Sequence, residues 1–147
     1  MLRLEHSVVI DRPRELVFAF VTNTENVPKW KKRLVEVRPI TSGPVGVGTT
    51  ETHVSRFMGR RFEVDHEITE YDSGHKVRFR TTSGPFPSEG QFMLQDVEGG
   101  TRLTIVSEAE PHGMFRLLAP VLRWVAKRRL ERDLALLKSV LEGASRC

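Results

Sequence analysis

Some polar side chains in this sequence fall on the apolar faces of predicted β-strands, where acid–base chemistry or ligand binding could use them. They are Glu51, His53, Ser55, His66 and Ser107. His66 shares one face of the alternating stretch 61–71 with apolar residues, and Ser107 shares an apolar face of the stretch 101–110. The other three share a face if Phe57 points inward, because successive side chains of a strand point to opposite faces.

These groups support more than one chemistry. A histidine and a carboxylate in a half-dry pocket could carry out general acid–base catalysis. The same side chains could instead orient the polar end of a largely apolar ligand, or they could lie near the sheet edge and contact water. Burying them without partners would cost about 1–3 kcal/mol each. We therefore expect them to be paired, hydrated or in contact with a ligand.

Standard catalytic and cofactor signatures do not occur in the chain. There is no HExxH, no CxxC pair, no GxSxG and no GxGxxG after a strand. The glycine-rich stretch 41–48 is followed neither by Lys-Ser/Thr nor by a helix, so it does not predict a phosphate-binding loop. The histidines show no metal-ligand spacing, and we expect neither a metal nor another cofactor. They are His6, His53, His66, His75 and His112.

The stretch 114–142 predicts the long helix that would cover the polar groups. At about 1.5 Å per residue it would run roughly 40 Å, longer than a small domain is wide. Pro120 is expected to kink this helix or to split off its first turn. Apolar residues fall on one side of it at helical spacing: Phe115, Leu118, Ala119, Leu122, Ala126, Leu130, Leu137, Val140 and Leu141.

Two further features of this helix leave alternatives open. Arg129 and Asp133 lie one turn apart within the apolar stripe. The simpler interpretation is an ion pair at the edge of the stripe, and the alternative is a charged pair that faces or plugs an internal cavity. Leu117, Val121 and Trp124 form a smaller apolar patch on the other side. A covering loop is the simplest explanation of that patch, and a dimer or membrane contact is the alternative.

The region before the long helix reads mainly as strands. The order strand, two short helices, six strands and long helix predicts an antiparallel meander. We expect an α+β fold, in which a curved seven-stranded antiparallel sheet wraps around the long C-terminal helix, in a single domain over residues 1–147. The strands are predicted at 4–10, 34–40, 49–57, 61–71, 76–82, 89–97 and 101–110, and the short helices from 13 to 22 and around 27–30.

Composition excludes several classes of protein. Hydrophobic content of 39% and charged content of 29% are ordinary for a globular domain. No apolar run approaches the ~18 residues of a membrane span, and residues 1–11 lack a signal-peptide core. The single cysteine, Cys147, excludes a disulfide within the chain. Together these features favour a reducing, cytoplasmic location.

The basic charge of the chain concentrates on the predicted long helix. The net charge is +4, and six basic residues lie between Arg116 and Arg132. Such a cluster could indicate nucleic-acid binding. However, Glu131 and Asp133 interrupt it, and no aromatic residues alternate with it. We interpret it as a solvated helix face and expect no nucleic-acid partner.

The chain resembles the helix-grip fold of the START-like superfamily and, within it, the polyketide cyclase/dehydrase and lipid-transport family. The resemblance covers essentially the whole chain. It implies a deep, mostly apolar cavity between sheet and long helix, which binds lipids, sterols, polyketides, hormones or quinones. A minority of such proteins catalyse aromatic cyclisation or dehydration, with no universal catalytic residue. The matching stretches are SVVIDRPRELVFAFVTN with Trp30, GPVGVGTT, FMGRRFEVDHEITEYD, VRFRTTSGPFPSEGQF, GGTRLTIVSEAEP and LERDLALLKSVLEG.

Positions matching Glu51 and His66 are commonly apolar or aromatic in similar sequences, so the resemblance implies an unusually polar pocket here. We expect the protein to bind a small, largely apolar ligand such as a lipid, polyketide or quinone. The ligand-binding residues are predicted to be Trp30, Glu51, His53, Ser55, His66, Phe79, Phe92, Ser107, Leu118 and Leu122. Further apolar wall or core is predicted from Phe20, Phe62, Val64 and Leu103.

Two alternatives stay open. The first is a metal-free cyclase or dehydratase, a lyase or isomerase in which His66 is the base and Glu51 is its partner or the acid. It would assist enolisation or dehydration of a polyketide-like substrate. The second is an interaction protein that acts through the basic helix, as a monomer or homodimer, with a peripheral membrane contact as one form of it.

Overall fold

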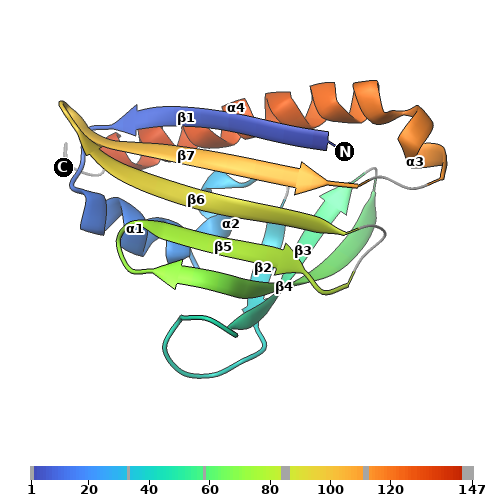
Figure 1. The fold of residues 1–147 in the computed structure, drawn as a ribbon, viewed down its shortest axis with the longest axis horizontal. Coiled ribbons are helices and arrows are strands. Elements are labelled where there is room, and N and C mark those ends of the chain that lie inside the picture. Colours follow the sequence, from blue (N-terminus) through green and yellow to red (C-terminus); the bar gives the residue numbers. More distant parts are fainter. Residues whose placement is uncertain (1, 33, 58, 84–86, 111–112, 144–147) are drawn as a thin grey trace.

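The computed structural model describes residues 2–32, 34–57, 59–83, 87–110 and 113–143. Seven strands form one antiparallel sheet in the order β1-β7-β6-β5-β4-β3-β2. The sheet curves, and the long helix α4 lies along its β1 edge (Figure 1). The strands are β1 Leu2–Ile10, β2 Leu34–Pro39, β3 Thr50–Phe57, β4 Arg60–Asp72, β5 Lys76–Thr81, β6 Ser88–Val97 and β7 Gly100–Ala109. The predicted helix-grip architecture is therefore confirmed.

Alternating side chains give the sheet a buried inner face and a charged outer face. On β5, Val77 is buried and Phe79 is half-buried, whereas Arg78 and Arg80 are exposed. On the outer face Arg80 pairs with Glu67 of β4 at 3.0 Å, as opposite charges on neighbouring strands do. Alternation along β5 thus separates the buried face of the sheet from its charged face.

Two short helices, α1 Arg14–Thr22 and α2 Val27–Trp30, close one end of the sheet. The buried residues of α1 follow the helical period. Trp30 ends α2 and is fully buried. The core that these helices form with sheet and α4 contains Ile10, Val17, Phe18, Val21, Trp30, Val77, Phe92, Leu94, Leu103, Ile105, Leu134, Leu137 and Leu141.

The C-terminal helical region is split as Pro120 predicted. α3 spans Met114–Leu117, and α4 spans Ala119–Gly143. The buried residues of α4 all lie in its second half. That half is also held by polar contacts, because Lys138 Nζ donates to the carbonyl of Val9 at 2.6 Å and Arg12 donates to the carbonyl of Glu142 at 2.7 Å. The second half of α4 is therefore anchored both by apolar burial and by hydrogen bonds to β1 and the residues that follow it.

Two residues predicted to supply wall or core are exposed instead. Phe62 lies near the turn that joins β3 and β4, and Leu118 caps the end of α3, where the helix is interrupted. Some expectations fall outside the described residues: the side chains of Phe57 and Phe115, the connectors at 84–86 and 111–112 with His112, and Cys147. Within the described residues, no helix is both long and apolar enough to cross a bilayer.

Candidate functional site

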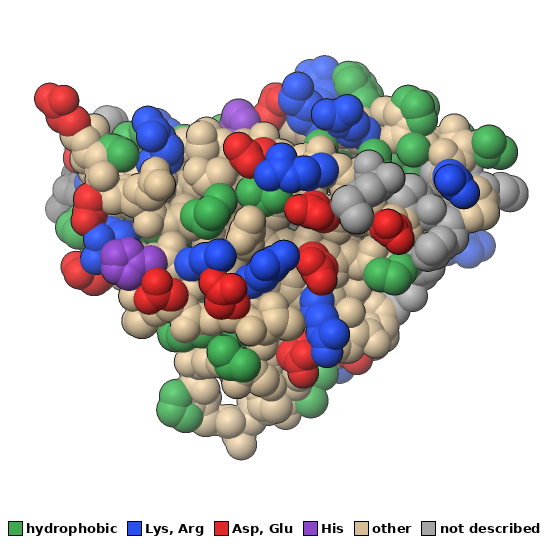
Figure 2. Space-filling view, viewed as in Figure 1, with side chains coloured by type: hydrophobic (Ala, Val, Ile, Leu, Met, Phe, Trp, Pro, Cys, Tyr) green, Lys and Arg blue, Asp and Glu red, His purple; other side chains and the backbone are tan. Residues whose placement is uncertain are grey.

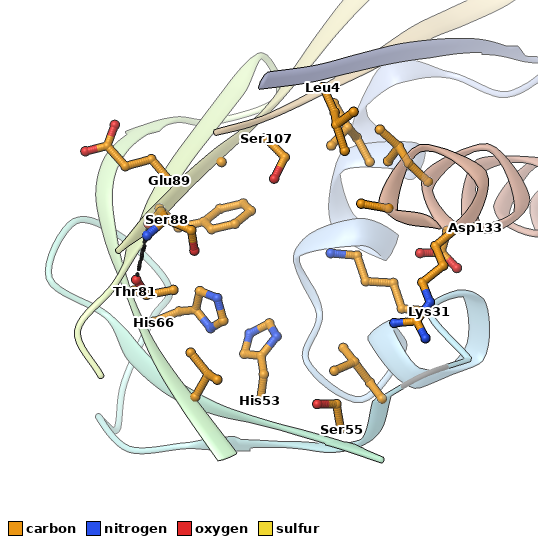
Figure 3. A pocket seen from close by; sticks show the side chains of 18 of the residues that line it. Leu4, Lys31, His53, Ser55, His66, Thr81, Ser88, Glu89, Ser107 and Asp133 are labelled. Carbon is orange, nitrogen blue, oxygen red and sulfur yellow. Dashed lines mark hydrogen bonds between the residues drawn. The ribbon is translucent and has the colours of Figure 1, made fainter. Parts of the chain in front are cut away.

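A cavity of about 320 Å³ lies between the inner face of the sheet and the middle of α4 (Figure 3). Each of the seven strands contributes to one wall, and α4 supplies the opposite wall. Its lining includes Leu4, Lys31, Leu34, His53, Ser55, Val64, His66, Phe79, Thr81, Ser88, Ile105, Ser107, Ala126, Arg129, Leu130 and Asp133.

A second, smaller chamber of about 50 Å³ adjoins this cavity. The two spaces share Lys31, His53, His66 and Phe79 as common walls. Most of the other walls of the smaller chamber are apolar, and Glu51 is its carboxylate. We use "main cavity" and "small chamber" for the two spaces below.

The register of β3 and β4 brings the polar candidates together. Glu51 is the cross-strand partner of His66, and His53 is the partner of Val64. His53 and His66 are consequently diagonal neighbours on the inner face. Their ring centroids are 4.1 Å apart with a tilt of 53°, and both rings point into the cavity in Figure 3. His53 and Ser55 line the main cavity and Glu51 lines the small chamber, which is the placement that the sequence made conditional on the direction of Phe57.

A carboxylate fixes one of the two imidazoles. Glu51 Oε1 lies 2.8 Å from His53 Nε2, so the Nε2–H form of His53 donates a hydrogen bond to it. Both side chains are mostly buried. The partner of Glu51 in this contact is therefore His53, two residues along the same strand, whereas the sequence hypothesis paired Glu51 with His66.

Aromatic rings form the wall behind the histidines. The ring of Phe79 contacts the rings of His66 and Phe92 edge-on, with 5.8 Å and 5.3 Å between ring centroids. The ring centroid of Phe92 lies 6.2 Å from that of Trp30. Phe79 lies over Gly90, where a Cβ atom would come within 2.8 Å of the ring. Glycine at position 90 thus makes room for the ring that separates the main cavity from the small chamber.

The wall facing the histidines is charged. Arg129 and Asp133 of α4 line the main cavity, so the cavity-facing interpretation of this pair is confirmed. Lys31, just after α2, joins them, and its Nζ lies 5.0 Å from the ring centroid of Trp30. Figure 3 places Lys31 and Asp133 across the cavity from His53 and His66. The main cavity therefore has imidazoles at one end and charged groups at the other.

The predicted ligand-binding residues divide into three groups. His53, Ser55, His66, Phe79 and Ser107 line the main cavity, and Glu51 and Phe92 line the small chamber. Trp30 lies behind Phe92 in the core, and neither Leu118 nor Leu122 is among the described lining residues. Sequence reasoning missed the role of Lys31, Thr81, Ser88, Ala126 and Leu130 in the lining. Helical spacing had placed two of these, Ala126 and Leu130, on the apolar stripe that contains Arg129 and Asp133, but it did not assign them to the lining.

Metal chemistry has no candidate ligand set in the described part of the chain. No group of three or more His, Cys, Asp or Glu side chains there is arranged to hold a metal ion. The chemistry that these residues can perform is hydrogen bonding and proton transfer by imidazole and carboxylate.

Comparisons with known proteins agree on fold. The model of a family described as polyketide cyclase / dehydrase and lipid transport matches residues 1–142. None of the curated proteins matches the chain. The structure of TTHA0849 from Thermus thermophilus is similar, with a TM-score of 0.82 at 22% identity over 97% of this chain and 99% of that one.

Two other solved structures resemble the chain at lower identity. The protein of unknown function SA2116 from Staphylococcus aureus has a TM-score of 0.79 at 12% identity, covering 99% of this chain and 96% of that one. NE0264 from Nitrosomonas europaea has a TM-score of 0.75 at 16% identity, covering 99% and 97%. At these identities the three structures show a shared fold alone.

Proposed function

Because the chain belongs to the polyketide cyclase / dehydrase and lipid transport family, we propose that it binds a small, largely apolar ligand with a polar end in the main cavity. The observation that carries the proposal is the two-sided lining of this space. Phe79, Ile105 and Leu130 offer apolar surface, while His53 and His66 point into the same space. A few convergent polar groups in an apolar pocket are typical of small-molecule sites.

The volume of the main cavity favours a compact ligand. About 320 Å³ lies at the lower end of the range of roughly 300–1,000 Å³ of ligand pockets. At about 30 Å³ per water molecule this is the space of about ten waters. A ring system of one to three rings suits this space better than a long-chain lipid. The polar end of such a ligand would accept or donate hydrogen bonds at the imidazoles.

Blocking the cavity from the helix side tests the proposal. Ala126 lines the main cavity, whereas Ala135 is exposed on the same helix. Ala126→Phe should fill the cavity, and Ala135→Phe adds the same ring to the surface. Binding of 1-anilinonaphthalene-8-sulfonate (ANS), an aromatic probe of apolar sites, should fall at least tenfold (~1.4 kcal/mol) in Ala126→Phe and stay unchanged in Ala135→Phe. Native mass spectrometry of the purified protein would report any resident ligand.

Equal ANS binding in both variants would count against the proposal, because the probe would then lie elsewhere. Loss of a resident adduct in Ala126→Phe alone would support it. Circular dichroism of both variants separates loss of binding from loss of fold. The adduct itself, extracted under denaturing conditions, would identify the ligand class.

A second candidate is an acid–base enzyme of the cyclase or dehydratase type, and the Glu51–His53 contact favours it. A carboxylate that holds an imidazole is a common arrangement for a general base. In a dehydration, an imidazole would take the proton next to a carbonyl, the carbon–oxygen bond would break, and the hydroxyl would leave as water with a proton from an acid. The sequence predicts His66 as the base, and the contact with Glu51 makes His53 an equal candidate.

Turnover of a model substrate tests this candidate. β-Hydroxypropiophenone gives a conjugated enone on dehydration, which ultraviolet absorbance detects. The two variants are His53→Phe and His66→Phe. The rate of dehydration should fall roughly 10²–10⁴-fold in whichever of them lacks the base. No turnover by the wild-type protein, together with intact ANS binding, would leave the binding proposal standing and remove the enzyme candidate for this substrate class.

A further inference from the structure

The junction of α3 and α4 exposes a group of large apolar side chains. Leu117 is 84% exposed, Trp124 is 60% exposed and Val121 is 59% exposed. We call these three residues the Trp124 patch. The predicted patch is thus confirmed as apolar surface, and no described part of the chain covers it. Single exposed apolar residues are ordinary, but a group of neighbouring large ones is typical of a surface that contacts another protein or a membrane.

Basic side chains surround the patch, and the nearest acidic residues in sequence are Glu110 and Glu131. Residues 111–130 contain no Asp or Glu, and their Arg and Lys residues begin at Arg116. The guanidinium of Arg128 lies 5.1 Å above the ring of Trp124, and Arg123 and Lys127 are exposed beside it. Figure 2 shows Lys and Arg side chains gathered with hydrophobic ones along the upper edge, over α3 and the start of α4.

The charges on the outer face of the sheet are arranged differently. There Lys and Arg alternate with Asp and Glu (Figure 2), and the structure pairs Arg78 with Glu89 and Arg80 with Glu67. A surface of paired charges has little net potential, whereas the α3–α4 surface is apolar and positive at once. That combination is specific to one region of the molecule rather than a consequence of the overall charge of +4.

We propose that the Trp124 patch and its basic rim dock the protein on the surface of an anionic lipid bilayer. Trp is favoured at the membrane interface, Leu and Val gain by leaving water, and Arg and Lys reach anionic headgroups while their stems stay apolar. This proposal goes beyond ligand binding and does not depend on it.

Charge complementarity selects the bilayer over other occupants. A second copy of the chain would bring the same basic rim against itself, and like charges across an interface are unfavourable. RNA would satisfy the basic residues, but Leu117 and Val121 would gain nothing from phosphates, and Trp124 offers a single stacking ring. An anionic lipid surface accommodates both the apolar residues and the positive charge.

Docking would place the cavity wall next to the lipid. The turns of α4 that expose Trp124 line the main cavity with Ala126 and Arg129 on their other side. A bilayer on the outer face would therefore contact the same helical segment that closes the cavity. The buried residues of α4 all lie in its second half, so the bilayer would meet the least buried part of the helix.

Vesicle co-sedimentation tests the proposal with vesicles of phosphatidylcholine alone and of about two thirds phosphatidylcholine and one third phosphatidylserine. The wild-type protein should bind the anionic vesicles more tightly and lose binding as salt is raised. Arg123→Gln with Lys127→Gln should weaken binding about fivefold per residue replaced. Trp124→Ser should reduce binding to both kinds of vesicle.

Matched controls use exposed residues of the same type elsewhere. Val47 is an exposed apolar residue of the loop before β3, and Arg102 is an exposed basic residue of β7; Val47→Ser and Arg102→Gln should leave binding unchanged. Any of these results would overturn the proposal: no binding to anionic vesicles, equal loss in the controls, or a dimer that Trp124→Ser converts to monomer. Tighter binding to RNA than to vesicles would also overturn it.

Discussion

Glu51 and His53 lie two residues apart on β3, and their side chains meet at 2.8 Å beside the small chamber. Side chains at this spacing point to the same face of a strand, and the imidazole reaches back along the strand to the carboxylate. The His53 side chain is 14% exposed and that of Glu51 is 21% exposed. The contact therefore fixes an imidazole at the boundary between the main cavity and the small chamber.

A double-mutant cycle should measure this contact. Glu51→Ala and His53→Ala should each lower the free energy of unfolding, because each removes a hydrogen bond between two mostly buried groups. The coupling between them should be about 1 kcal/mol, from urea unfolding of the two single variants, the double variant and the wild type. Additive effects would contradict the prediction.

An exposed pair of the same spacing provides the control. Arg3 and Glu5 of β1 form an ion pair at 3.0 Å, but their side chains are 55% and 51% exposed. Exposed ion pairs contribute about 0–1 kcal/mol. The same cycle on this pair should give coupling near zero at moderate salt, which separates burial from spacing as the source of coupling.

The fold could be predicted from the sequence because its signals are local. Alternation identifies strands, and a stripe of apolar residues identifies the long helix, whatever the tertiary structure is. Pro120 acts on its own helix, so the break that it causes could be predicted. The prediction that Phe62 and Leu118 are buried was wrong. Periodicity gives the direction in which a side chain points, but it does not show whether another element covers that side chain.

The site could be predicted only in part. Strand parity placed Glu51, His53 and His66 on one side, and the cavity shows that this face is the inner one. Which of them pair depends on the register between β3 and β4 and on rotamers, which alternation does not determine. Lys31 could not be found at all, because it enters the cavity from the end of α2 and follows no period.

Gly90→Ala should change the shape of the cavity. The new methyl group would come within 2.8 Å of Phe79, so the ring must move toward the main cavity or the small chamber. We expect a loss of stability of about 1–3 kcal/mol, typical of overpacking, and weaker ANS binding. Urea unfolding and ANS titration measure the two effects separately.

Gly46→Ala controls for the loss of a glycine. A Cβ atom at Gly46 meets no atom within 4 Å, so this substitution should leave stability within about 0.5 kcal/mol and ANS binding unchanged. If Gly90→Ala behaved like Gly46→Ala in both measurements, Phe79 would not be held against the strand as described.

Acid should weaken the attachment of α4 through Glu142. The hydrogen bond from Lys138, and then that from the backbone N–H of Asp11, lower the pKa of Glu142 from its ordinary value of 4.5. A carboxyl whose pKa is lower in the folded state stabilises the fold above pH 4.5, and this stabilisation is lost as the pH falls through the folded-state pKa. Glu142→Gln should lack this contribution.

Chemical unfolding across the acid range measures that difference. The wild type should be more stable than Glu142→Gln near neutral pH, and the two curves should converge at the lowest pH. A constant difference at every pH would mean that the carboxylate charge is irrelevant and that only the shape of the side chain matters. Glu98→Gln, which replaces an exposed carboxylate in the turn between β6 and β7, is the control and should follow the wild-type curve.

Alanine substitutions at Gly99 and Gly100, where β6 turns into β7, should distinguish the cost of backbone strain from the cost of steric contact. Gly99 and Gly100 have φ angles of 90° and 132°, so alanine is strained at both, at a cost of about 1–2 kcal/mol. A Cβ atom at Gly99 meets no atom within 4 Å, whereas one at Gly100 would lie 2.1 Å from the carbonyl oxygen of Ile10. The end of β1 and the start of β7 must separate to admit it. Gly100→Ala should therefore cost about 2 kcal/mol or more beyond Gly99→Ala in urea unfolding, and equal costs would show that strain alone accounts for glycine at both positions.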